Sequence, residues 1–171
     1  MTAAYPDDTY SPRTKENKSG VVYDAGKTTI GYVEDVTKLD AEVVAIETDL
    51  RARKYSITFI IDGGGSAITT GEKGHLRIPF ACEIERVTLL ADQSGSIVVN
   101  IWKDTYANFP PLVGDKITAS APPTITTAQK SEDDTLTGWT KAIVAGDILA
   151  FNIDSCTNIT RVTLALKVKK T

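Results

Sequence analysis

Few side chains in this chain of 171 residues could take part in covalent chemistry. His75 is the single histidine, and Cys82 and Cys156 are the two cysteines. A Ser-His-Asp or Cys-His arrangement would have to recruit His75, but no nucleophile motif accompanies it. We therefore expect a surface or strand histidine, two thiols that stay free unless the setting is oxidising, and no enzymatic activity.

Two segments carry only part of a ligand-binding pattern. The run GGGSAITTG, residues 63–71, is rich in glycine but lacks the GK[ST] end of a phosphate-binding loop and a following helix. The acidic run SEDD, residues 131–134, has oxygen ligands for Ca²⁺ but not the spacing of an EF-hand. One histidine and two cysteines cannot complete a zinc set. We expect an inter-strand loop, a solvated acidic turn, and no metal or cofactor.

The two tryptophans, Trp102 and Trp139, are candidates for stacking against a sugar ring. Trp102 lies in the alternating run IVVNIWK and Trp139 follows Gly138. A large ring in such a position is more often buried in a core or in a subunit interface. Both interpretations, a glycan contact and burial, stay open on the sequence alone.

The composition excludes some classes of partner. A net charge of −3 provides no basic surface for nucleic acid. No apolar run approaches the roughly 20 residues that a membrane span needs. The N-terminal residues lack the apolar core of a signal peptide, so we expect synthesis in a cytoplasm.

The sequence predicts a short amphipathic helix over residues 34–54, because apolar residues recur there at steps of three and four. With Val36, Val43 and Leu50 at the a positions, the e and g positions are all acidic, which opposes association in a parallel bundle. The helix is therefore predicted to be a joint in an oligomer, or alternatively to pack on its own domain. The predicted seam consists of Val36, Leu39, Val43, Ile46 and Leu50.

Residues 1–33 are polar and cannot bury enough apolar surface to fold alone. They are predicted to be either an extended arm that becomes ordered on a partner or a flexible tail. The apolar and aromatic residues that would anchor such an arm are Tyr5, Tyr10, Val22, Tyr23, Ile30 and Tyr32.

Residues 55–171 are predicted to form a β-domain. Seven or eight short runs are rich in Val, Ile, Thr and aromatic residues, and Gly, Pro, Asp and Ser separate them. The segment from Tyr106 to Asp134 contains four prolines and is predicted to be a long crossing along an edge. The fold class is therefore mainly β: an antiparallel, jelly-roll-like sandwich after a short helix and an extended arm.

Several runs are similar to a β-domain of tailed-bacteriophage fibre proteins: GEKGHLRIPFACEIERVTLLADQSGSIVVNIWKDTYANFPP, TLTGWTKAIVAGDILAFNIDS and ITRVTLALKV. The run KTTIGYVEDVTKLDAEVVAIETDL resembles the short helix that precedes such domains. The resemblance implies a homotrimeric head fibre or decoration protein on the virion surface. Its arm would contact capsid proteins and its β-domain would face outward. A tail fibre, or a module that binds a receptor or glycan of the host, is the alternative.

Overall fold

The computed structural model describes residues 28–171, with the side chains of residues 28–37 and of Arg51 excluded. The chain divides into two compact units, residues 1–52 and residues 53–171. Tyr5, Tyr10, Val22 and Tyr23 of the predicted arm lie outside the described residues.

The first unit contains a single described helix, α1, which spans Thr28–Ala52 and has 25 residues. It begins six residues earlier than the sequence predicted, so Ile30 and Tyr32 lie in α1 and not in an extended arm. Once a helix has nucleated, each added residue gains one backbone hydrogen bond, so the strong helix formers that follow can extend the helix past Gly31. At 1.5 Å per residue, α1 is about 37 Å long.

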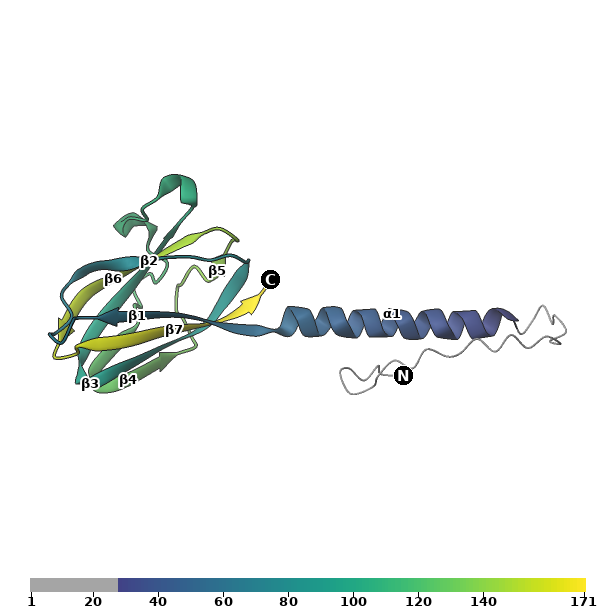
Figure 1. The fold of residues 1–171 in the computed structure, drawn as a ribbon, viewed down its shortest axis with the longest axis horizontal. Helices are drawn as coiled ribbons and strands as arrows, with labels where there is room; N and C mark the ends of the chain where they lie inside the picture. The colour runs from purple at the N-terminus through teal and green to yellow at the C-terminus, as the bar shows by residue number, and fades with distance from the viewer. Residues whose placement is uncertain (1–27) are drawn as a thin grey trace. The chain divides into compact units, whose positions relative to one another are not determined.

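The second unit is an antiparallel β-domain, as predicted (Figure 1). Its sheet has seven strands, and the hydrogen-bonded path runs β1-β7-β3-β6-β2, with β4 and β5 also pairing with β3. The sheet curls, which confirms the mainly β, jelly-roll-like fold class. The strands are β1 Lys54–Asp62, β2 Gly71–Arg77, β3 Cys82–Asp104, β4 Thr124–Asp133, β5 Ala142–Ile143, β6 Ile148–Thr157 and β7 Arg161–Lys170.

The 23-residue strand β3 organises the domain. Its first half pairs with β7 and its second half with β6. The two partners follow each other in the chain and are separated only by residues 158–160. The Asp92 carboxylate fixes this junction, because Oδ1 accepts from the backbone N–H groups of Thr160 (3.2 Å) and Arg161 (3.0 Å) and Oδ2 accepts from the Thr160 hydroxyl. These bonds lower the pKa of Asp92 below its ordinary value, the hydroxyl of Thr160 having the largest effect.

The core lies inside the curl of the sheet. The rings of Phe59 in β1 and Phe151 in β6 stack with centroids 4.2 Å apart. Because β7 and β3 separate these two strands in the sheet order, the contact requires the sheet to fold over on itself. Side chains alternate along β7 between the core and the other face of the sheet, and its inward residues are all fully buried: Val162, Leu164, Leu166 and Val168.

The segment between β3 and β4 differs from its prediction. Two short 3-10 turns, η1 Tyr106–Asn108 and η2 Val113–Asp115, lie in a lobe that leaves the sheet. The second part of the predicted crossing is instead strand β4, because the β-branched run after Pro123 favours extended pairing. The prolines stand before the strand, and among the described strands β4 pairs only with β3, so they interrupt no ladder.

Candidate interaction surfaces

The described part of α1 carries several exposed apolar side chains. Of the predicted seam, Leu39 is 57% exposed, Val43 46%, Ile46 39% and Leu50 47%. Val36 lies in the helix, but its side chain is outside the described residues. Four large apolar residues at a and d spacing on one helix form a stripe that a partner surface can cover. We call Leu39, Val43, Ile46 and Leu50 the α1 stripe.

Acidic residues border the α1 stripe on both sides. Asp40 and Glu47 occupy the e positions, and Glu42 and Asp49 occupy the g positions. In a parallel bundle these carboxylates would face one another and repel. The stripe can therefore supply apolar contact between helices, but the repulsion between the carboxylates beside it reduces the free energy of association.

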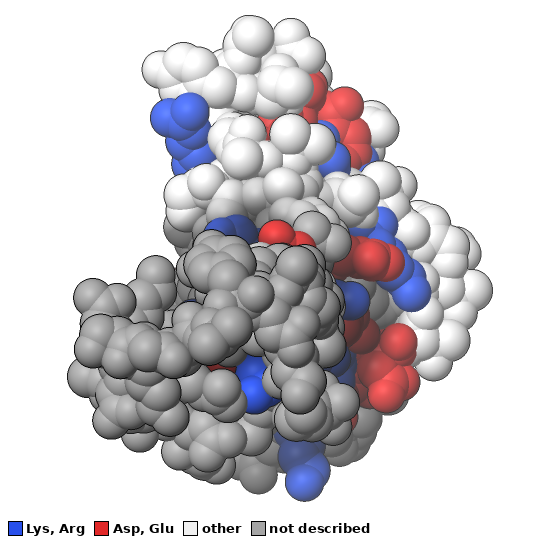
Figure 2. All heavy atoms as spheres, turned by 90° about the vertical axis from the view of Figure 1, so that its right-hand side faces the viewer, with Lys and Arg blue, Asp and Glu red and all other residues white. Residues whose placement is uncertain are grey.

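One face of the protein carries mixed charge over its described part. On the face shown in Figure 2, Lys and Arg are interspersed with Asp and Glu over the described area, and no large area has one sign. The ion pairs follow the same pattern, for example Lys54 Nζ with Glu85 Oε2 at 2.6 Å. The hydrogen bond and charge of Lys54, with Lys167 and Lys169 nearby, lower the pKa of Glu85.

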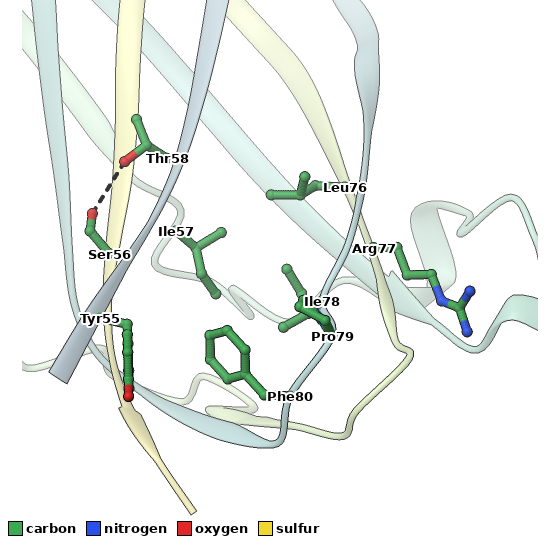
Figure 3. A pocket seen from close by; sticks show the side chains of 9 residues that line it. All are labelled: Tyr55, Ser56, Ile57, Thr58, Leu76, Arg77, Ile78, Pro79 and Phe80. Atoms are coloured by element: carbon green, nitrogen blue, oxygen red, sulfur yellow. Dashed lines mark hydrogen bonds between the residues drawn. The ribbon is translucent and has the colours of Figure 1, made fainter. Parts of the chain in front are cut away.

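A groove lies between β1 and β2, the two end strands of the sheet path (Figure 3). Tyr55 and Phe80 pack with ring centroids 5.4 Å apart, and Arg77 points away from the groove. Its volume of about 270 Å³ is below the 300–1,000 Å³ typical of small-molecule sites. The apolar side chains that line the groove therefore join the two ends of the curled sheet, and they leave little room for a ligand. Its apolar lining is Tyr55, Ile57, Leu76, Ile78, Pro79 and Phe80.

The two tryptophans have different environments. Trp139 belongs to the core and is 7% exposed, and its Nε1–H donates to the carbonyl of Ala121 at 2.8 Å. Little of its ring is open to a sugar. Trp102 in β3 is half-buried, and its Nε1 is buried without a hydrogen-bond partner among the described residues. Among the described residues, no ring contact joins Trp102 and Trp139.

The groups that could take part in chemistry are dispersed. His75 lies in β2, Cys82 begins β3 and Cys156 is near the end of β6. Both cysteines are free, and burial raises the pKa of each thiol, so neither is an activated nucleophile. Among the described residues no group of three His, Cys, Asp or Glu side chains is placed to hold a metal ion. In the same part of the chain, no helix combines the length and apolar character that a membrane span needs.

The sequence predicted one long crossing over residues 106–134, but it did not single out the exposed apolar residues of the lobe between β3 and β4. Tyr106, Phe109, Leu112 and Val113 are each more than half exposed there. Aromatic residues beside prolines in a long connection were the available signal, since ordered loops of this length are often functional.

Comparison with known proteins gives little guidance. No protein-family model and no curated protein matches the chain. Among solved structures, a chain of the "Structure of infectious bursal disease virus Gx strain" is similar with 13% sequence identity and a TM-score of 0.21. The match covers 71% of this chain and 35% of that chain, so it spans about a third of the viral chain. A likeness this weak carries no argument about the present protein.

Proposed function

We propose that the protein is a structural component of a tailed-phage virion. In this proposal it is a homotrimer, attached to the capsid through its N-terminal arm, and it presents its β-domain outward. A tail-fibre position is the alternative attachment. The sequence resemblance to phage fibre domains supports the class of protein, and the α1 stripe supports the assembly.

The observation that carries the proposal is the exposure of the α1 stripe. Each of its four residues is between 39% and 57% exposed in the single chain. Fully burying one such side chain is worth about 1.5–3 kcal/mol, so covering the exposed part of each contributes about 1 kcal/mol. Helices of neighbouring copies are the natural cover, because a and d spacing is the pattern of a helix bundle.

We expect the α1 stripe to have a limited role in assembly, because the acidic residues beside it repel one another in a parallel bundle. Its four residues would contribute only about 4 kcal/mol per chain, and association itself costs about 4–15 kcal/mol. We infer that contacts between β-domains supply the rest and that α1 sets register and position between the arm and the β-domain.

Absolute mass by light scattering tests the assembly. The full chain is compared with residues 53–171, which form a compact unit with its own core. A trimer is expected for the full chain and a weaker trimer for the shorter one. A monomeric full chain at working concentrations would contradict the proposal.

A decoration assay tests the attachment. Phage particles that lack the protein are mixed with either chain, and bound protein is measured after the particles are sedimented. The full chain is expected to bind and residues 53–171 are not. Equal binding of both would show that the arm and α1 are not the anchor, and labelling visible in electron micrographs distinguishes head from tail.

A further inference from the structure

A second, larger cavity lies where the lobe meets the end of β2. It has a volume of about 550 Å³, within the 300–1,000 Å³ range of small-molecule sites and about twice that of the groove between β1 and β2. The strand side is formed by two residues of β2 and one of β6, and the lobe side by two aromatic residues. The lining residues are His75, Arg77, Ile148, Tyr106 and Phe109.

The two sides of the cavity are held by separate parts of the domain. Arg77 ends β2 and pairs in register with Ile148 of β6, so the sheet fixes the position of the cation. Asp104 fixes the lobe, because its Oδ1 accepts from the backbone N–H of Thr105 (2.7 Å) and from Nδ2 of Asn108 (3.1 Å). The adjoining turn carries Tyr106 beside the sheet.

Contacts across the cavity join the two sides. The guanidinium carbon of Arg77 is 5.3 Å from the ring centroid of Tyr106, which is a cation–π distance. The ring of Phe109 stands edge-on to the imidazole of His75, with centroids 4.7 Å apart. The cavity is thus framed by two aromatic rings that are more than half exposed and by one exposed cation.

The one permanently charged side chain that lines the cavity can attract an anion. Arg77 is the permanently charged residue of the lining, and no carboxylate in the described part of the chain lies within ion-pair distance of it. Glu72 lies beside His75, with Oε1 3.1 Å from Nε2, and Asp104 is committed to the lobe. A guanidinium without an acidic partner can bind a carboxylate through two parallel hydrogen bonds.

We propose that this cavity binds an acidic sugar unit of a polysaccharide. The sugar carboxylate pairs with Arg77, and the apolar C–H face of the sugar ring stacks on Tyr106 or Phe109. A single guanidinium matches a carboxylate of charge −1 better than a phosphate monoester, whose charge approaches −2 at neutral pH. The rings that stack are those of the lobe, and not Trp102 and Trp139. This proposal does not rest on trimer formation or on attachment to a particle.

Binding of defined oligosaccharides to the full chain tests the proposal. Calorimetry is carried out with oligogalacturonate, oligoglucuronate, oligomannuronate and oligosialic acid, each beside the same oligosaccharide with its carboxylates reduced to alcohols. We expect saturable binding of at least one acidic oligosaccharide and roughly 10- to 100-fold weaker binding of its reduced form, because the charge-assisted bonds are lost. No binding of any acidic oligosaccharide would overturn the proposal.

Variants identify the site. Arg77→Ala is expected to weaken binding about as much as reduction of the carboxylate, and Tyr106→Ala roughly tenfold through lost stacking. Arg161→Ala is the matched control, since it removes an exposed arginine at the start of β7, away from the cavity lining, and should leave binding unchanged. Unchanged binding by Arg77→Ala, or an equal loss in Arg161→Ala, would overturn the assignment. A carboxylate-terminated peptide that binds where all acidic sugars fail would also overturn it.

Discussion

Replacing one residue of the α1 stripe should weaken association by an amount that its exposure allows us to work out. Val43 is 46% exposed in the single chain, so assembly can remove at most about half of the 1.5–3 kcal/mol that full burial of a valine is worth. Val43→Ser therefore costs about 1 kcal/mol per chain and about 3 kcal/mol per trimer. This lowers the trimer association constant roughly 100-fold. The association constant of a trimer has units of inverse concentration squared, so the protein concentration at the midpoint of dissociation varies as the inverse square root of that constant. A 100-fold weaker constant therefore raises this midpoint concentration roughly tenfold.

The neighbouring valine provides a matched control. Val44 is 60% exposed and stands at the b position, outside the seam. Val44→Ser makes the same chemical change in the same helix, with the same small effect on helix propensity. Sedimentation equilibrium over a dilution series should show the shifted midpoint for Val43→Ser alone. If both variants shift equally, the register of the seam is wrong. If neither shifts, α1 does not contribute to association.

Two further predictions concern the junction at which β3 changes partner. A Cβ added at Gly95 would lie 2.8 Å from Cγ1 of Ile159 and in contact with the Thr157 carbonyl, so Gly95→Ala should lower the free energy of unfolding by about 3 kcal/mol. Gly114→Ala, where nothing lies within 4 Å, should stay within about 0.5 kcal/mol in the same urea titration, and similar values for both would refute the packing argument. The pKa of Asp92 is lower in the folded protein than its ordinary value of 3.8, so ionised Asp92 stabilises the fold. This contribution is complete at a pH above 3.8 and is lost as the pH falls through the pKa of the folded state. Urea titrations over this pH range should therefore show a shallower acid loss for Asp92→Asn than for the parent, and an identical slope would show that Asp92 carries no such linkage.

Local sequence pattern determined the class of α1 and of the strands other than β4. Steps of three and four in α1 and alternation in β7 reflect the geometry of helix and strand, so they could be predicted without tertiary information. The start of α1 could not, because extension of a helix depends on cooperative hydrogen bonding more than on residue type. The strand β4 was not predicted, because the prolines before it indicated a crossing along an edge. The β-branched run that follows them pairs with β3 instead.

The sequence by itself determined that this chain joins a helix with an apolar seam to an antiparallel β-domain with few groups for covalent chemistry. Only the tertiary structure decided which side chains share a surface. It placed Trp139 in the core, stacked Phe59 on Phe151 across the curl, and set Tyr106 over Arg77 although 29 positions separate them in the sequence. Such contacts depend on strand order and register, which join residues distant in the chain, and residue spacing does not encode them.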